Sequence, residues 1–389
     1  MHVVFLTSAF PHDAGSGVDM VHVRRARELA RRAPVVAVVP TPGVPPLLRR
    51  TPRFAAYAGV PRSARLAGIP IFYPRYLQVP GMGPAAGASM ALGALPVIRR
   101  LRRHGRCDVI FAQAILPDGL AAVLLGRATG AAVACLGRGS DVNLAGRSRW
   151  GRWLTKRVVR HAAAVGTVAH DLADTLRRRA GGQPPAVLYN GIDLDRFAPG
   201  DPHDARRALD VDPSGPIVLF VGRLVPGKGL DVLVDAFARL ATLRPDARLV
   251  LVGDGPLRAD VTRRAFGAGV SRHLTITGAV PHERVADWMR AADLVALPSE
   301  AEGFPNVVRE ALACGRPVVA TAVGDLPRIV TSQTGRLVPV GDVAALAAAL
   351  TAVLETTWDP AVLRAAVADM TWERCAAATH RFLADAIAA

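Results

Sequence analysis

Residues 216–237 read PIVLFVGRLVPGKGLDVLVDAF and contain a strand-like segment, a loop and a helix-like segment in that order. The apolar run 217–221 is typical of a buried strand, and three glycines punctuate the loop that follows it. Apolar residues then recur at helical spacing at Leu230, Leu233, Val234 and Phe237. A buried strand, a glycine-rich loop and an amphipathic helix together form the repeating unit of a parallel α/β sheet.

The same alternation extends through both halves of the chain. Strand-like runs occupy 3–6, 35–40, 108–113, 131–137, 248–253, 274–278, 294–299 and 317–324, with helix-like segments between most of them. The sequence therefore predicts an α/β protein with two tandem Rossmann-like, doubly wound domains facing a cleft. We expect domains at 1–195 and 196–370, a polar, Pro-rich linker near 190–212, and a helix at 371–389 that returns to the first domain.

Positive charge is concentrated in the first half. Residues 1–200 hold 28 Lys+Arg against 10 Asp+Glu, a net of +18, whereas residues 201–389 hold 20 against 22, a net of −2. Such a surface attracts an anionic partner, either phospholipid headgroups or a phosphorylated acceptor, although a solvated Arg-rich surface explains it equally well. We do not expect nucleic acid as the partner, because aromatic residues are not interleaved with the arginines.

The cysteines and the uncharged segments bear on location. Four scattered cysteines, without metal-ligand spacing, predict reduced, buried thiols in a cytoplasmic protein. The longest uncharged run, 76–98, contains four glycines and three prolines, a mixture that a membrane-spanning helix would tolerate poorly. We expect no signal peptide, since the chain enters directly as a strand. The predicted location is the cytoplasm, with peripheral contact at the inner membrane face.

Two loops carry candidate binding residues. Arg223 and Lys228 follow the strand 217–221 and could clamp a diphosphate. Lys228 is one of only two lysines in a chain with 46 arginines. The stretch EGFPNVVRE (302–310) predicts a helix start, where backbone amides can receive phosphate oxygens. Its backbone positions are Gly303, Phe304, Pro305, Asn306 and Val307. Glu302 could bind sugar hydroxyls, and Glu310, expected two turns into the helix, could bind a ribose diol. Taken alone, a pair of glutamates at this spacing favours ordinary helix-start and surface charge.

In combination these motifs resemble the nucleotide-sugar domain of family 4 glycosyltransferases. The resemblance covers FVGRLVPGKGLDVLVDAF, LVGDGPLR, YNGIDLDRF and the stretch 293–330. It implies the GT-B fold and retaining transfer from a nucleoside-diphosphate sugar, with UDP or GDP expected, and without a cofactor or metal. It assigns Glu302 to the donor sugar, Glu310 to the ribose, and Arg223 and Lys228 to the phosphates.

The first half resembles the same family less strongly. TSAFPHDAGSGV (7–18) is similar to its amino-terminal glycine loop, which implies that Gly15 and Gly17 lie near the donor phosphates and acceptor, with His12 beside them. PDGLAAVLL and RGSDVN resemble a branch that acts in bacterial cell-surface polysaccharide synthesis, of the teichuronic-acid type. Many relatives have histidine where this chain has Gln113 and Arg138. We expect His12, Gln113 and Asp141 near the acceptor, and Arg138 on the donor diphosphate or an anionic acceptor.

Several alternatives remain open. The hydroxyl acceptor could be a lipid-linked or cell-surface glycan, or a soluble natural product such as an aminocyclitol of an antibiotic pathway. A nucleotide-sugar 2-epimerase and a non-catalytic nucleotide-sugar binding protein are the other candidates. Asp193 and Asp195 look like a metal-binding DxD, but their position in the linker motif favours a structural role. His22, His170 and His282 are interpreted as ordinary loop or surface histidines.

Overall fold

The computed structural model describes residues 1–10, 20–44, 57, 59–78, 83–139, 141–142, 148–211 and 214–389. The chain folds into two compact units. Unit 1 comprises Met1–Gly191 and Trp372–Ala389, and unit 2 comprises Ile192–Thr371. The chain therefore changes unit at 191/192 and at 371/372, close to the boundaries expected at 195/196 and 370/371.

Unit 1 is built on one sheet in the order β10-β9-β8-β7-β1-β2-β5-β4, in which β4 runs antiparallel to β5 and the other neighbours are parallel. The strands are β1 (Val3–Leu6), β2 (Val35–Val38), β4 (Ser63–Leu66), β5 (Ile69–Phe72), β7 (Val109–Ala112), β8 (Ala132–Gly137), β9 (Ala164–Thr167) and β10 (Ala186–Val187). A separate pair joins β3 (Thr41–Pro42) to β6 (Arg75–Tyr76). The strands β1 and β7 are buried throughout, as their unbroken apolar sequences predict.

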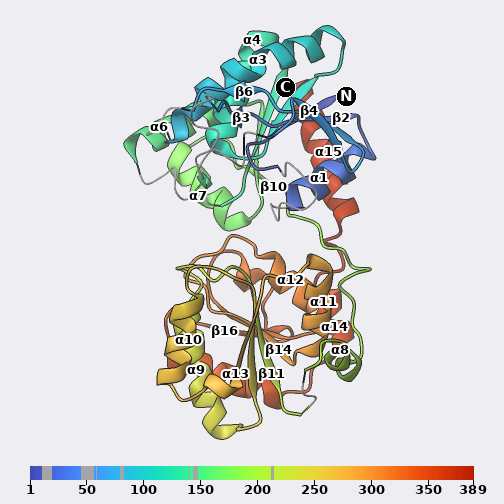
Figure 1. Ribbon diagram of the computed structural model, residues 1–389. Coiled ribbons are helices and arrows are strands. Elements are labelled where there is room, and N and C mark those ends of the chain that lie inside the picture. Colours follow the sequence, from blue (N-terminus) through green and yellow to red (C-terminus); the bar gives the residue numbers. More distant parts are fainter. Residues whose placement is uncertain are drawn as a thin grey trace. The chain divides into compact units, whose positions relative to one another are not determined.

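Helices form two groups around this sheet (Figure 1). The helix α15 (Trp372–Ala388) packs on α1 (Met20–Ala30) and on β7, β8 and β9, so the two ends of the chain, red and blue in Figure 1, lie side by side. The second group is α3 (Ala86–Arg103), α4 (Leu120–Thr129), α6 (Arg149–His161) and α7 (His170–Ala180), with the short turns η2 (Gly83–Ala85) and η3 (Ile115–Gly119). The helix α3 accommodates Pro96 in its interior.

Arg25 of α1 holds residues 188–190, the segment just before the chain leaves unit 1. Its side chain is fully buried, and Nη2 donates to the carbonyl oxygens of Leu188 (3.1 Å) and Tyr189 (3.0 Å) and to Oδ1 of Asn190 (3.0 Å). Nη1 donates to Oγ1 of Thr379 on α15 at 3.2 Å. One guanidinium therefore holds the segment that leaves unit 1 and the helix that returns to it.

Unit 2 contains a fully parallel sheet in the order β13-β12-β11-β14-β15-β16. Its strands are β11 (Ile217–Val221), β12 (Arg248–Val252), β13 (Leu274–Gly278), β14 (Leu294–Leu297), β15 (Val318–Thr321) and β16 (Gly335–Val338). Numbered along the chain, this is the order 3-2-1-4-5-6 of a Rossmann fold, in which the direction of winding reverses between the first and fourth strands. That switch point lies between β11 and β14.

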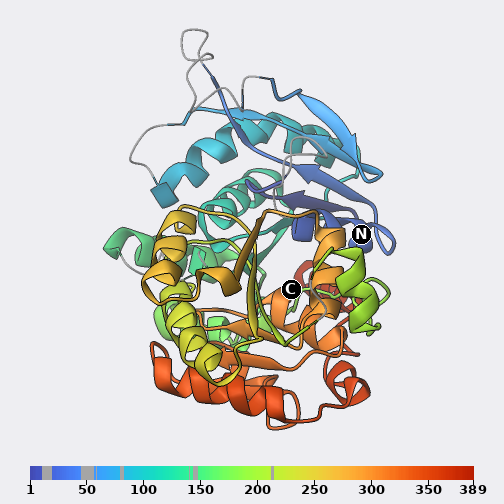
Figure 2. The same ribbon diagram turned by 60° about the horizontal axis from the view of Figure 1, so that its bottom comes forward.

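The helices of unit 2 cover both faces of this sheet (Figures 1 and 2). The first group is α9 (Leu230–Leu243), α10 (Arg258–Gly267) and α13 (Val343–Glu355), of which α13 packs on α9 and on β14, β15 and β16. The second group is α8 (Pro202–Ala208), α11 (His282–Ala291), α12 (Asn306–Ala313) and α14 (Pro360–Ala365). The turns η4 (Ser271–His273) and η5 (Leu326–Arg328) complete the unit.

The expected linker at 190–212 is wrong in part, because α8 lies within it and packs on α11. Arg206 of α8 is buried, and its Nη2 lies 2.7 Å from Oδ2 of Asp293. The same Oδ2 accepts from the backbone N–H of Ile217 at 2.6 Å. A charge in a Pro-rich polar stretch thus anchors that stretch to the start of β11, a contact between residues far apart in sequence.

The burial predicted for the cysteines is confirmed for three of the four. Cys107, Cys135 and Cys314 are buried and Cys375 is partly buried, all as free thiols. Burial raises the pKa of Cys107 to about 11, which keeps that thiol protonated and unreactive. Among the described helices, none combines the length and the apolar run that crossing a bilayer requires.

Asp118, in the turn η3, is a fully buried carboxyl group. Both of its oxygens accept from the backbone N–H of Ser8, each at 3.2 Å, which ties η3 to the segment that follows β1. Burial raises the pKa of Asp118 from 3.8 to about 7, and the hydrogen bonds from Ser8 oppose this shift. Folding therefore favours the protonated form of this carboxyl group.

The raised pKa of Asp118 predicts a specific pH dependence of stability. Its contribution is fully present below the unfolded pKa of about 4 and is lost as the pH rises through about 7. We expect Asp118→Asn, which cannot ionise, to gain stability relative to the wild type between pH 4 and 7, by up to about 1.4 kcal/mol per pH unit. Urea unfolding of both proteins at several pH values measures this difference; parallel curves would contradict it.

Candidate functional site

The loops that follow β11 and β14 leave the same edge of the sheet in unit 2. Val218 of β11 pairs with Leu294 of β14, so residues far apart in sequence emerge next to each other at the switch point. The backbone N–H of Glu300 donates to the carbonyl oxygen of Gly227 at 2.9 Å, which joins the two loops. Gly229 has φ +63°, and a Cβ there would lie 2.1 Å from the carbonyl oxygen of Pro298. The close approach of the loops therefore requires glycine.

Lys228 and Glu302 form an ion pair across these loops. Nζ of Lys228 lies 2.5 Å from Oε1 of Glu302, which also accepts from Oγ of Ser299 at 2.8 Å. The side chains are 27% and 13% exposed, respectively, so water screens the pair only partly. Glu302 therefore holds the ammonium in one place at the edge of the sheet, with Ser299 fixing the carboxylate.

Arg223 supplies a second cation at the end of β11. Its side chain is exposed and makes no hydrogen bond or ion pair with any residue that the structure describes. In contrast to Lys228, this guanidinium is available to an incoming anion without breaking an internal contact. The structure thus brings Arg223, Lys228 and Glu302 to one edge, as the sequence predicts.

The segment 303–307 leads into α12 and presents backbone groups at its start. In the described part of the chain, no side chain caps the amino terminus of α12, so its first N–H groups can bind an anion. Pro305 has no N–H and cannot donate. Phe304 is buried, with the Arg309 guanidinium 4.6 Å from its ring centroid, so its ring is part of the unit's packing. Of the predicted set, Gly303, Phe304, Asn306 and Val307 retain backbone donors.

A second glycine shapes the same segment. Gly324 has φ +55°, and a Cβ there would lie 2.1 Å from the carbonyl oxygen of Glu302. The backbone N–H of Asp325 donates to the carbonyl oxygen of Gly303 at 2.9 Å. The turn after β15 therefore supports the backbone beside Glu302 and fixes where α12 begins.

Glu310 lies one turn into α12, which corrects the expected two turns, because the helix begins at Asn306. Its Oε1 is 3.4 Å from Nε2 of His282, and the side chain is 14% exposed. The ring of His282 meets that of Phe197 edge to face with centroids 5.4 Å apart, and Nδ1 lies 3.3 Å from Nη1 of Arg196. His282 is exposed, as predicted, but its contact with Glu310 was not predicted.

Arg138 and His22 meet at the carboxyl-terminal edge of the sheet in unit 1. Nη1 of Arg138 lies 2.8 Å from Nδ1 of His22, and Nη2 donates to Oδ1 of Asn190 at 3.3 Å. His22 is buried, and burial followed by the charges of Arg138 and Arg25 lowers its pKa well below the ordinary value. The expectation of a surface histidine is therefore wrong, and His22 is held neutral against two guanidinium groups.

Asp141 and Gln113 occupy neighbouring strand ends in unit 1. Asp141 accepts from the backbone N–H groups of Ile115 (2.6 Å), Arg138 (2.9 Å) and Gly139 (3.0 Å), so its carboxylate fixes the local loop. Burial raises its pKa and these bonds oppose the shift. Gln113 is buried, and neither polar atom of its side chain bonds a described residue. The predicted acceptor roles of both residues stay predictions.

Three predicted residues, His12, Gly15 and Gly17, lie outside the described residues. Asp193 accepts from the backbone N–H of Arg196 at 3.1 Å, a local structural contact. Nε2 of His170 lies 3.4 Å from the hydroxyl oxygen of Tyr189. His170 therefore has a partner, as His22 and His282 do. In the residues that the structure describes, no group of three His, Cys, Asp or Glu side chains is placed to hold a metal ion.

Sequence reasoning did not identify Ser299 or the role of His282. Ser299 lies two residues after the end of β14, and a polar residue just beyond the carboxyl end of a buried strand is a signal that could have found it. His282 begins α11, and its partners Phe197, Arg196 and Glu310 come from distant parts of the chain. No local pattern predicts that arrangement.

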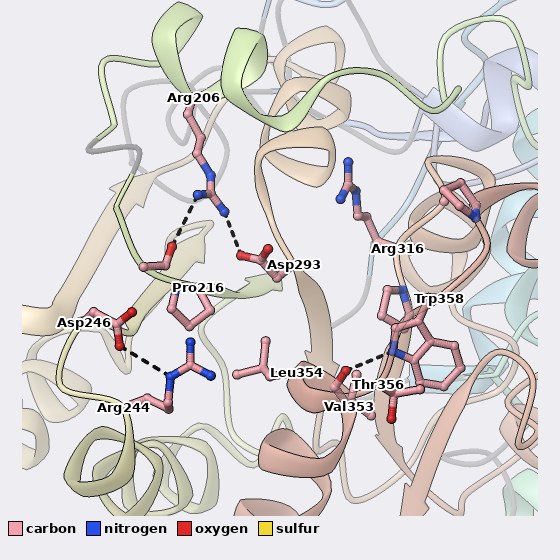
Figure 3. Close-up of a pocket in the computed structure, with 14 residues that line it drawn as sticks. Arg206, Pro216, Arg244, Asp246, Asp293, Arg316, Val353, Leu354, Thr356 and Trp358 are labelled. Carbon is pink, nitrogen blue, oxygen red and sulfur yellow. Dashed lines mark hydrogen bonds and ion pairs between the residues drawn. The ribbon is translucent and has the colours of Figure 1, made fainter.

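A separate pocket of about 500 Å³ lies at the opposite edge of the sheet in unit 2 (Figure 3). Its lining includes Pro216 and Asp293, which precede β11 and β14, so it adjoins the amino ends of these strands. The charged groups in it largely bind one another: Arg206 pairs with Asp293 at 2.7 Å and Arg244 with Asp246 at 3.5 Å. We therefore place the candidate site at the carboxyl edge instead.

Comparison with known proteins bears on the family of this chain. A family model described as Glycosyltransferase Family 4 matches residues 15–196, and one described as Glycosyl transferases group 1 matches residues 215–356. The inferred teichuronic acid biosynthesis glycosyltransferase TuaC of Bacillus subtilis is 30% identical over 370 residues, which cover 93% of this chain and 92% of TuaC. A D-inositol 3-phosphate glycosyltransferase of Mycobacterium sp. strain JLS is 42% identical over 190 residues, 47% of this chain and 42% of that protein.

The fold is similar to that of solved glycosyltransferase structures. Anabaena HepE in complex with UDP superimposes with a TM-score of 0.76 at 19% identity, covering 99% of this chain and 100% of that one. At this identity the likeness concerns the fold alone. Since both halves match family models and TuaC is similar along nearly the whole length, the chain belongs to glycosyltransferase family 4 and has the GT-B fold.

Proposed function

We propose that this protein transfers a sugar from a nucleoside-diphosphate sugar to a hydroxyl acceptor, with retention of the anomeric configuration. The observation that carries the proposal is the set of charges at the switch point of unit 2. There Arg223 is exposed, Lys228 is held by Glu302, and α12 begins without a side-chain cap in the described part of the chain. Two cations and a helix amino terminus at the carboxyl edge of a parallel sheet suit a diphosphate.

The donor is proposed to be a UDP- or GDP-sugar. HepE, which shares this fold, has been solved with UDP and with UDP-glucose. In this chain Glu310, held by His282, would accept hydrogen bonds from the ribose diol, and Glu302 would lie near the sugar. A carboxylate accepts from two adjacent hydroxyls without needing a proton of its own.

In the proposed reaction, the bond between C1 of the sugar and the diphosphate oxygen breaks first. Arg223, Lys228 and the backbone donors at 303–307 would stabilise the negative charge that develops on the leaving diphosphate. The acceptor oxygen forms its bond to C1 on the same face, and its proton passes to the departing phosphate oxygen. These groups supply the charge stabilisation, so the proposal requires no metal ion.

The acceptor is proposed to be an anionic or lipid-linked glycan at the inner face of the membrane. The similarity to TuaC supports this choice because it extends over the first half of the chain as well as the second. Positive charge supports it too, since residues 1–200 carry a net +18. Arg138, Gln113 and Asp141 lie in unit 1, the half to which this acceptor is assigned.

Replacing Lys228 tests the phosphate contact. We expect Lys228→Ala to lower kcat/KM for the donor by roughly 10- to 150-fold, the effect of losing one charge-assisted hydrogen bond of about 1.5–3 kcal/mol. Arg263→Ala, at an exposed arginine of α10, is the matched control and should leave the rate unchanged.

A double variant separates two causes of that loss. Lys228→Ala leaves the Glu302 carboxylate without its cation, and this charge would itself repel a diphosphate. We expect Lys228→Ala/Glu302→Gln to recover little activity if Lys228 binds phosphate directly. Recovery to the level of Glu302→Gln alone would show that Lys228 only neutralises Glu302.

A donor panel tests the reaction itself. We expect slow hydrolysis of one UDP- or GDP-sugar without acceptor, insensitive to EDTA, with the released sugar in the donor's anomeric configuration. Glu310→Ala should lower this rate and weaken nucleotide binding. Dependence on a divalent cation, or an inverted product, would overturn the corresponding part of the proposal. A 2-epimerised sugar would identify an epimerase. Nucleotide binding without turnover of any donor would identify a binding protein, provided that lipid-linked, anionic and aminocyclitol acceptors had also been tried.

A further inference from the structure

The helix α6 presents an unusual surface. Its sequence RWGRWLTKRVVRH buries Gly151, Leu154, Thr155 and Val158, which pack it against α4, α7 and η3. Ser148 caps the helix, because its Oγ accepts from the backbone N–H of Gly151 at 2.9 Å. The buried stripe determines which side of α6 faces outward.

Two tryptophans lie on that outward side. Trp150 is 73% exposed and Trp153 is 50% exposed, and their rings meet edge to face with centroids 5.6 Å apart. The Arg157 guanidinium lies 5.5 Å from the centroid of the Trp153 ring. Exposed indoles packed on each other rather than into the core are rare in a folded unit, and they mark an interaction surface.

The charge around the tryptophans has one sign within the helix. The helix carries Arg149, Arg152, Lys156, Arg157 and Arg160 and has no carboxylate. Its neighbour α7 begins with Asp171 and Asp174 but ends in Arg177, Arg178 and Arg179. Tryptophan beside clustered Lys and Arg is the composition that partitions into the interface of an anionic bilayer, where indoles sit at the headgroup level.

We propose that the outward face of α6, formed by Trp150, Trp153 and the five surrounding cations, docks this protein on an anionic lipid bilayer. The indoles would insert among the headgroups while the cations bind lipid phosphates. This docking goes beyond the proposed function, which places the acceptor at the inner face of the membrane, because it assigns membrane binding to the outward face of α6. Docking needs neither donor nor acceptor, so it can be tested separately from sugar transfer.

The test is sedimentation of the full chain with vesicles of phosphatidylglycerol and phosphatidylcholine, compared with phosphatidylcholine alone, without nucleotide sugar. We expect the wild type to bind the anionic vesicles and to be released by salt. The double variant Trp150→Ser/Trp153→Ser should bind them roughly tenfold more weakly. Phe266→Ser is the matched control, since Phe266 on α10 is 80% exposed, and it should bind as the wild type does.

Charge variants separate the two components of docking. Arg152→Gln/Lys156→Gln/Arg157→Gln should weaken binding at low salt and flatten its salt dependence, whereas the tryptophan variant should keep the wild-type salt dependence. Wild-type binding by the tryptophan variant, or no preference of the wild type for anionic vesicles, would overturn the proposal. Loss of nucleotide-sugar hydrolysis by the tryptophan variant in the absence of vesicles would also overturn it, because the indoles would then belong to the reaction site.

Discussion

The pairing of β11 with β14 is the constraint on which the candidate site depends. Consecutive strands diverge from this point in opposite directions, so the loops after β11 and β14 have no helix crossing between them. Lys228 and Glu302 are 74 positions apart, yet their side chains meet because both strands end at the same edge. Gly229 and Gly324 then remove the side chains that would separate the backbones. A strand register therefore sets the geometry of charges that no local sequence feature could place.

Lys228 and Arg223 differ in the contacts that they make before a ligand binds. Lys228 is paired with Glu302 before any ligand arrives, so its rotamers are already restricted and little entropy is lost when an anion binds. The paired carboxylate also lowers the net positive charge, which makes the site less attractive to simple anions. Arg223 is exposed and unpaired among described residues, and its planar donors suit a bidentate phosphate contact. One cation is thus preorganised and the other is recruited by the ligand.

Strand and helix positions were largely predictable because fully buried parallel strands have unbroken apolar sequences, as in β1, β7 and β11. The loop residues Arg223, Lys228 and Glu302 were predictable for the same reason, since each follows a strand whose end is visible in the sequence. The errors involve contacts between distant residues. His22 is buried beside Arg138, and the contacts of His282 with Glu310 and Phe197 were not predicted. The 190–212 stretch is not a simple linker, because the ion pair between Arg206 and Asp293 anchors it to unit 2.

The helix α6 shows the limit of sequence reasoning most clearly. Large apolar residues usually face a core, whereas both tryptophans of RWGRWLTKRVVRH are exposed. The buried stripe instead consists of Gly151, Leu154, Thr155 and Val158, which is narrow enough to pack closely on α4 and α7. With these four residues filling the contact, the indoles lie on the same side as the cations. The composition of α6 therefore suits two different environments. Its buried stripe suits a protein core, and its exposed face suits the headgroup region of a membrane.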